Sequence, residues 1–176
     1  VLNLANKTQP GGRVAQGYAA QEEDLYRRTD ASRHTQKYFS STDVYPLNQV
    51  QPVAMILKDV TIIRGPCDQG YPFLDITQKI TLISVAAQKE PALIMDGGVA
   101  YYASVTERHA MRMKVRVTLK AIIDSGCDAG VVSAFGCGAF KHPPEEVAQL
   151  FREEIEAAGS DLPFIIFSIL DDHNTR

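Results

Sequence analysis

The sequence lacks tryptophan and has few cysteines, which are Cys67, Cys127 and Cys137. Their odd number and the absence of a Cys-x-x-Cys spacing argue against a disulfide framework and against a structural zinc site. The four histidines show no pairing that would present two metal ligands on one face. We therefore expect no metal and no cofactor. A reducing intracellular compartment, cytoplasm or nucleus, is the simpler expectation.

The sequence also lacks long apolar runs and an excess of basic residues. No apolar stretch is long enough to span a bilayer, and no basic-apolar-small leader opens the chain. The first residues read as the inside of a strand, so a truncated N-terminus and a removed leader stay open. The net charge is −3, so no global field recruits polyanions. We expect neither membrane association nor general nucleic-acid binding.

What is present suits one globular domain, residues 1–176, because 45% of the residues are hydrophobic and 22% are charged. Helix-like patterns alternate with strand-like runs, which predicts an α/β fold built as a three-layer sandwich. The expected helices are 19–29, 30–41, 106–126 and 143–159, and the expected strands are 1–6, 53–57, 60–63, 73–76, 79–86, 128–135 and 164–170. Lys58-Asp59 predicts a hairpin turn, whereas 40–52 and 88–98 are expected to be irregular or loops.

A glycine-rich loop that runs into an acidic helix start is the most informative stretch. Gly11 and Gly12 precede a helix that begins near Gln21-Glu22-Glu23. Backbone N–H groups of a narrow loop beside the positive end of a helix suit a phosphate. Read alone, the same residues also fit an ordinary turn and a solvated glutamate pair that complements the helix dipole.

A second loop, residues 134–144, repeats this arrangement. Gly136 and Gly138 would let the backbone approach a phosphate at the start of the helix that opens with Pro143-Pro144. A tight strand-to-helix turn is the alternative. Together the two loops could close on one diphosphate. The glycine spacings of the P-loop and of the Rossmann fingerprint are both absent, so hydrolysis of a nucleoside triphosphate has no support.

A basic row lies on the longest predicted helix. Arg108, Arg112, Arg116 and Lys120 recur every four residues. A track for polymer phosphates is one interpretation. A solvated face is favoured, because side chains four apart line up on any exposed helix.

Taken together, these stretches resemble the microbial-type poly(ADP-ribose) glycohydrolases of the macrodomain superfamily. That family's signature is three glycines, a short spacer and Gln-Glu-Glu, and here Arg13 replaces the third glycine. The resemblance also covers Asn3, Asn6, the Gly-Cys-Gly-Ala-Phe loop at 136–140 and the segment 169–174. It implies a macrodomain-like three-layer α/β/α sandwich with a mixed central sheet.

The resemblance further implies hydrolysis of ribose–ribose O-glycosidic bonds with release of ADP-ribose. Glu23 would be the general acid and then the general base, and Glu22 would orient the ribose hydroxyls. The partners would be poly(ADP-ribose) or ADP-ribose, and ADP-ribosylated proteins. Ligand contacts are expected from Asn6, Gly11, Gly12, Val14, Gln21, Gly136, Cys137, Gly138, Ala139 and Phe140, the last against the terminal ribose.

A different class of function stays open beside the enzyme. A non-hydrolytic macrodomain would bind ADP-ribose or a related signalling nucleotide and leave the glutamate pair idle. Arg13 keeps this alternative open, because a long side chain in place of a glycine could narrow the ribose pocket. The intact Gln21-Glu22-Glu23 favours the enzyme, which in turn requires the Arg13 side chain to lie at the pocket rim.

Overall fold

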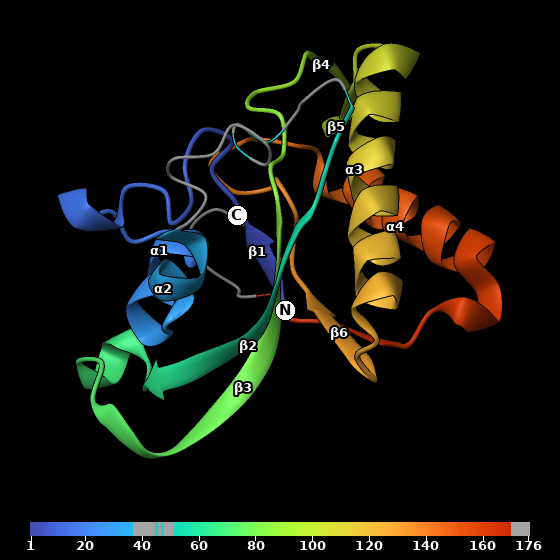
Figure 1. The fold of residues 1–176 in the computed structure, drawn as a ribbon. Coiled ribbons are helices and arrows are strands. Elements are labelled where there is room, and N and C mark those ends of the chain that lie inside the picture. The colour runs from blue at the N-terminus through green and yellow to red at the C-terminus, as the bar shows by residue number, and fades with distance from the viewer. Residues whose placement is uncertain (37–44, 46, 48–50, 170–176) are drawn as a thin grey trace.

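A mixed β-sheet forms the centre of the computed structural model, which describes residues 1–36, 45, 47 and 51–169 (Figure 1). Strand β3 (Phe73–Val85) lies in the middle, parallel to β1 (Leu2–Leu4) and antiparallel to β2 (Met55–Arg64). Two smaller sheets accompany it. Strands β6 (Ala129–Val132) and β7 (Phe164–Phe167) are parallel, and β4 (Leu93–Asp96) and β5 (Val99–Tyr102) form an antiparallel hairpin. The predicted α/β class with a mixed sheet is confirmed.

Helices lie on both faces of the β1–β3–β2 sheet. Helices α1 (Gln21–Arg28) and α2 (Ala31–Thr35) lie on the left of it in Figure 1, and α3 (Val105–Ser125) and α4 (Pro144–Ala158) lie on the right. Three short 3₁₀ helices complete the described elements: η1 (Val14–Gln16), η3 (Cys67–Gln69) and η4 (Gly159–Asp161).

The core divides into two clusters because β3 buries side chains on both of its faces. Leu82 packs in the cluster that contains Tyr26 of α1. Ile83 packs in the cluster that contains residues of α3 and α4, such as Val115 and Leu150. The alternation of a strand sends successive side chains to opposite faces, so a continuous apolar run covers both.

The sequence-based helix boundaries are largely confirmed. Ser104 caps α3 by accepting a hydrogen bond from the backbone N–H of Glu107, and Gly126 ends this helix at a positive φ of 72°. Pro144 lies at the start of α4. Helix α2 begins at Ala31, one residue after the start of the expected helix 30–41.

Three expectations about strands and loops are wrong. Lys58-Asp59 is not a turn between two strands, since β2 is continuous and shifts its register there, with Asp59 at a φ of 60°. The extra residue forms an irregularity inside the strand. The expected strands 73–76 and 79–86 likewise form the single strand β3, which ends at Val85. The expected loop 88–98 contains β4, and the tight turn lies at Gly97-Gly98, whose φ values are both positive.

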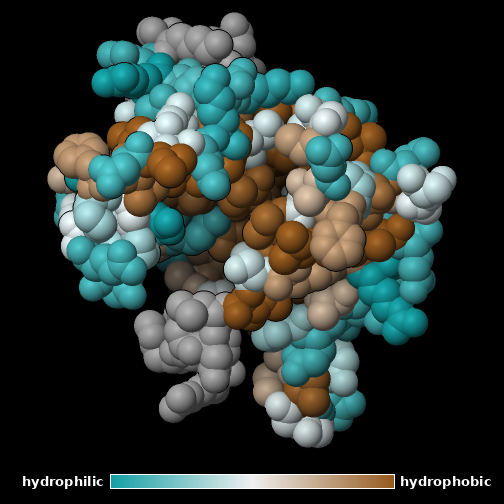
Figure 2. All heavy atoms as spheres, turned by 90° about the horizontal axis from the view of Figure 1, so that it is seen from below, coloured by the Kyte–Doolittle hydropathy of each residue, from teal (hydrophilic) through white to brown (hydrophobic). Residues whose placement is uncertain are grey.

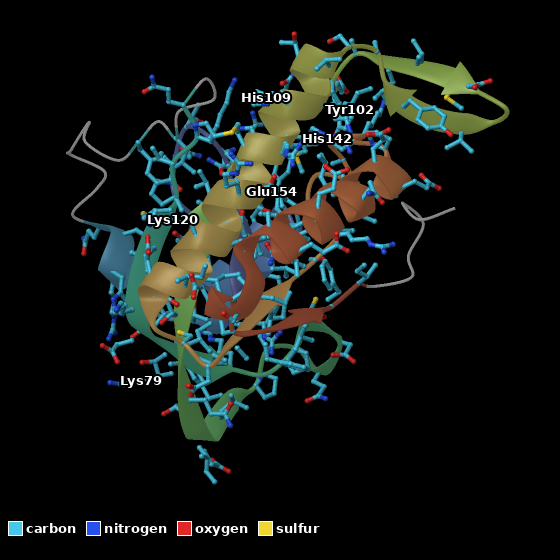
Figure 3. All side chains as sticks on the ribbon, turned by 90° about the vertical axis from the view of Figure 1, so that its right-hand side faces the viewer. Lys79, Tyr102, His109, Lys120, His142 and Glu154 are labelled. Atoms are coloured by element: carbon cyan, nitrogen blue, oxygen red, sulfur yellow. The ribbon has the colours of Figure 1, made fainter. Side chains whose placement is uncertain are left out.

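The three arginines of the basic row on α3 pair with glutamates of α4. Arg108 contacts Glu146 and Glu153, both at 2.8 Å. Arg112 and Arg116 both contact Glu154, which is only 4% exposed and lies on α4 between the two helices (Figure 3). Lys120 is exposed, as expected, and pairs with Asp124. The three arginines are therefore not free for phosphates, whereas the favoured solvated face holds for Arg116, which is 52% exposed, and for Lys120.

An apolar surface surrounds β7. Figure 2 shows hydrophobic residues gathered on the face that is seen from below. Strand β7 exposes Phe164, Ile166 and Phe167, and an open groove lined by residues such as Ile155 and Leu162 runs beside it. This groove shares no lining residue with the two glycine loops.

Two further expectations concern the membrane and the outer segments. None of the described helices has the length and apolarity needed to cross a bilayer. Most of the expected irregular segment 40–52, the end of the expected helix 30–41 and residues 170–174 of the C-terminal motif lie outside the described residues. Strands β6 and β7 end at Val132 and Phe167, before the predicted ends.

Candidate functional site

Two buried glutamates face the first glycine loop. Glu22 and Glu23 lie in the first turn of α1 and are only 3% and 7% exposed. Gly12 has a φ of 56°, and a Cβ at this position would overlap Oε1 of Glu23 and lie 3.0 Å from Oε2 of Glu22. Both carboxylates therefore converge on Gly12. Only glycine leaves this space open.

Glu22 is held by three donors. Its Oε1 accepts hydrogen bonds from the Asn3 side-chain amide at 3.2 Å and from the Gly11 N–H at 3.0 Å, and its Oε2 accepts from the Asn6 N–H at 2.6 Å. Burial raises the pKa of Glu22 to about 7 against the lowering effect of these bonds, and the Glu23 charge adds to the rise. Glu22 therefore has a fixed geometry and exchanges its proton near neutral pH.

Glu23 is held by the residue that departs from the family signature. The backbone N–H of Arg13 donates to Oε1 of Glu23 at 2.9 Å. Arg13 has a φ of −111°, which any L-residue adopts, so the loop does not need a glycine at this position. Its side chain is exposed and donates to the hydroxyl of Tyr18 at 3.1 Å, in agreement with the expected placement at the rim.

Asn3 and Gln21 attach α1 to β1. The Asn3 amide, which is fully buried, donates to Ser84 of β3 at 2.9 Å as well as to Glu22. The Gln21 side chain accepts from the N–H of Leu4 and donates to the carbonyl of Leu2, both at 2.8 Å. Gln21 thus bonds to the backbone of β1 as a neighbouring strand would, and this places the following glutamates.

The rest of the first loop is fixed by backbone contacts. The Asn6 side chain accepts hydrogen bonds from the N–H and the hydroxyl of Thr8, a turn that asparagine commonly makes. Arg27 donates to the carbonyls of Val14 and Tyr18 and so connects η1 and its flank to α1. A Cβ at Gly11 would lie 2.6 Å from the Tyr26 ring. The loop is therefore packed against the helix that carries the glutamates.

The second glycine loop rests on a buried histidine. A Cβ at Gly136 would lie 2.7 Å from the His142 ring. Nε2 of His142 is 2.8 Å from the carbonyl of Gln88, and Nδ1 is 2.7 Å from the hydroxyl of Tyr102. Since a carbonyl only accepts, we assign the proton to Nε2, and Tyr102 then donates to Nδ1. Figure 3 shows the two side chains together beside α3.

Burial lowers the pKa of His142, which fits a neutral ring that makes a hydrogen bond at each of its two nitrogens. The specific support that His142 and Tyr102 give to the loop was missed, because no sequence signal connects residues so far apart.

The outer part of the second loop faces open space. A Cβ at Gly138 would meet no described atom within 4 Å. Phe140 accepts a backbone hydrogen bond from Glu90 at 2.9 Å, and its partly buried ring packs on the core. Burial raises the pKa of the Cys137 thiol to about 11, so this cysteine is not a poised nucleophile.

Both loops lie at the same end of strands β1 and β3. Leu4 and Val85 are partners at the ends of the parallel strands β1 and β3, and the first loop follows Leu4. Gly136 lies against Ala87, two residues beyond the end of β3, since a Cβ there would lie 3.2 Å from Ala87 Cβ. The carboxyl ends of parallel strands are where α/β proteins bind ligands. Among the described residues, no group of three or more His, Cys, Asp or Glu could hold a metal ion.

The first third of the sequence is similar to a known family. Residues 1–62 match a family model described as the catalytic domain of microbial-type PARG, poly(ADP-ribose) glycohydrolase. No curated protein matches the sequence significantly. The predicted resemblance is thus confirmed over the part of the chain that carries the first glycine loop and the glutamates.

Solved structures extend the likeness to the fold. The poly(ADP-ribose) glycohydrolase of Thermomonospora curvata bound to the inhibitor ADP-HPD has a TM-score of 0.78 and 23% identity, over 98% of this chain and 64% of that chain. The enzyme of Deinococcus radiodurans in complex with ADP-ribose has a TM-score of 0.71 and 24% identity, over 98% and 68%. The present chain thus spans less than two thirds of the Thermomonospora curvata chain.

Proposed function

We propose that this chain carries the active site of a poly(ADP-ribose) glycohydrolase. It would hydrolyse ribose–ribose O-glycosidic bonds and release ADP-ribose, as one macrodomain-like domain with a three-layer α/β/α sandwich. The observation that carries the proposal is the convergence of two buried carboxylates on Gly12, each bonded to backbone N–H groups of the same loop. The match of residues 1–62 supports it.

Glu23 is the proposed general acid and base. Cleavage of a glycosidic bond passes through an oxocarbenium-like state, so the leaving oxygen needs a proton and the incoming water needs a base. Oε1 of Glu23 is bonded to the Arg13 N–H, whereas Oε2 has no hydrogen-bond partner among the described residues. Oε2 is therefore the atom proposed to exchange the proton.

Glu22 is the proposed residue that orients the ribose. Its three donors fix both oxygens, and its raised pKa keeps part of the population protonated near neutral pH. A carboxyl that is rigid and alternates between acceptor and donor suits ribose hydroxyls, which do both. Asn6 and Gln21 would act by holding the loop and the helix in place.

The second loop is proposed to hold the diphosphate. Its backbone from Gly136 through Cys137, Gly138 and Ala139 would supply the N–H groups, with Gly138 on the open side. Gly11, Gly12 and Val14 would close the site from the first loop, and Phe140 would pack against the terminal ribose. The free cysteines favour a reducing intracellular compartment. The substrate would be poly(ADP-ribose), free or on ADP-ribosylated proteins.

Incubation with labelled poly(ADP-ribose) tests the proposal directly. The wild-type chain should release ADP-ribose, and the Glu23→Gln variant should not, while both bind ADP-ribose in calorimetry. A wild-type chain that binds ADP-ribose and leaves the polymer intact would instead be a non-hydrolytic reader. A chain that binds neither ligand would contradict both assignments.

A further inference from the structure

The side chain of Arg13 extends from the active-site loop onto an exposed tyrosine. Its guanidinium carbon lies 5.3 Å from the centre of the Tyr18 ring. Its Nη1 donates a hydrogen bond to the Tyr18 hydroxyl at 3.1 Å. Tyr18 is 53% exposed. Arginine stacked on an aromatic ring keeps most of its N–H donors directed outward, because the ring occupies only one face of the plane.

Most of this guanidinium is available to a ligand. It has five N–H donors, and within the described part of the chain its only side-chain hydrogen bond is to Tyr18 and it takes part in no ion pair. By comparison, Arg27 is directed inward and donates to the carbonyls of Val14 and Tyr18. Arg27 thus holds the backbone of Tyr18 in place. The result is a positioned cation on a positioned aromatic ring.

The position of Arg13 relative to Glu23 indicates what it would meet. The Arg13 N–H bonds Oε1 of Glu23, so its side chain starts next to the proposed acid. That acid gives its proton to the oxygen of the leaving unit. The leaving unit must therefore contact Glu23 and continue away from the buried loop. The exposed side of the loop, where Arg13 and Tyr18 lie, is the side open to it.

We propose that Arg13 and Tyr18 form a subsite for the ADP-ribose unit next to the scissile bond, on its leaving side. The guanidinium would bind the diphosphate of this second unit in a charge-assisted contact, and the Tyr18 ring would pack on its apolar parts. This rests on the function proposed above. The subsite makes the chain selective for substrates with at least two ADP-ribose units over a single unit.

Binding in the Glu23→Gln background tests the subsite without hydrolysis. Affinity for ADP-ribose and for a two-unit oligomer is measured by calorimetry across a salt series. The oligomer should bind more tightly than ADP-ribose, and Arg13→Gln should weaken oligomer binding roughly three- to tenfold at low salt while changing ADP-ribose binding much less. The slope of log affinity against log salt for the oligomer should fall by about 0.7 to 1, because one phosphate contact is lost.

Two further variants separate the subsite from general charge. Arg13→Lys keeps the charge and should retain most of the salt slope. Lys120→Gln removes the same charge from α3, on the other side of the sheet (Figure 1), and should change neither affinity nor slope. In the active chain, Arg13→Gln should act on polymer mainly through a higher KM.

Equal affinities for the oligomer and for ADP-ribose, or an Arg13→Gln variant with the wild-type salt slope, would overturn the subsite and leave the glycohydrolase intact. If Arg13→Gln weakens the binding of ADP-ribose as much as the binding of the oligomer, the subsite is also overturned. Arg13 would then contact the ADP-ribose unit bound in the active site itself. Absence of ADP-ribose binding by the parent chain would instead remove the proposed function itself.

Discussion

Gly12 and Glu23 occupy adjoining space so closely that a single carbon added to Gly12 would overlap the Glu23 carboxylate. The loop and the helix that carries the proposed acid are thus fitted to each other. Position 12 therefore needs a glycine for two reasons. The backbone there has a positive φ, and any side chain would displace the Glu23 carboxylate.

Gly12→Ala should therefore reduce turnover at least 100-fold, because Glu23 must move or the loop must open. Gly70→Ala is the matched control. Gly70 also has a positive φ, of 77°, but a Cβ there would meet nothing within 4 Å. Gly70→Ala should lower the free energy of unfolding by only the backbone strain, about 1 kcal/mol, and should leave turnover unchanged. Equal loss of turnover in both variants would mean that strain, and not the carboxylate, is responsible.

Glu23→Gln should lower turnover on the order of 10²–10⁴-fold and change ADP-ribose affinity far less. Glutamine keeps the volume and one acceptor but cannot exchange the proton. Asp24→Asn is the control for loss of a negative charge in the first turn of α1, where Asp24 bonds Tyr71 and Arg28. Asp24→Asn should stay within a few-fold of wild type. A Glu23→Gln variant with wild-type turnover would exclude Glu23 as the acid.

The raised pKa of Glu22 predicts a pH dependence of stability. Below pH 4.5 the Glu22 carboxyl is protonated in the folded and the unfolded protein, so its ionisation does not lower the free energy of unfolding. Between pH 4.5 and about 7 the unfolded state releases this proton first, and the free energy of unfolding falls as pH rises, by at most about 3 kcal/mol.

Glu22→Gln should remove that contribution, so its unfolding free energy should vary less than wild type between pH 5 and pH 7.5. Urea unfolding at both pH values measures this. Glutamine also turns a donor toward the Asn6 N–H, which lowers stability at every pH. Glu156→Gln, an exposed change on α4, should keep the wild-type pH dependence. A Glu22→Gln profile parallel to wild type would contradict the raised pKa.

Gly138→Val should weaken ADP-ribose binding at least tenfold without lowering the melting temperature. A side chain there would project into open space, where it blocks a ligand and disturbs no packing. Gly136→Ala should lower the melting temperature, because a Cβ would meet the His142 ring. Calorimetry and thermal unfolding of the two variants separate binding from packing. Unchanged binding in Gly138→Val would place the diphosphate elsewhere.

Tyr102→Phe should destabilise the chain by about 1 to 3 kcal/mol, because it leaves the buried Nδ1 of His142 without a donor. ADP-ribose affinity should fall with it, as the loop above His142 loosens. Tyr101→Phe removes the hydroxyl of the neighbouring, exposed tyrosine and should be neutral. If the two variants behave alike, the contact with His142 does not support the loop.

The sequence by itself determined the features that depend on near neighbours. Gly126 ends α3 and Pro144 starts α4, because C-capping and proline geometry act within a few residues. The sequence placed the start of α3 at Thr106, one residue after its observed start at Val105. The placement of Glu22 and Glu23 at a helix start after a glycine loop is equally local. The four-residue spacing of the arginines on α3 could also be read from the sequence. Their pairing with the glutamates of α4 could not.

Only the tertiary structure decided what distant residues do to one another. Lys58-Asp59 is an irregularity inside β2 because β3 pairs on both sides of it, which no local pattern reports. The arginines of α3 are neutralised because α4 places Glu154 between two of them. Arg13 fits in a glycine's place because the folded loop holds it at a negative φ and needs only its N–H for Glu23. These outcomes depend on contacts between residues far apart in the chain, and such contacts exist only once it has folded.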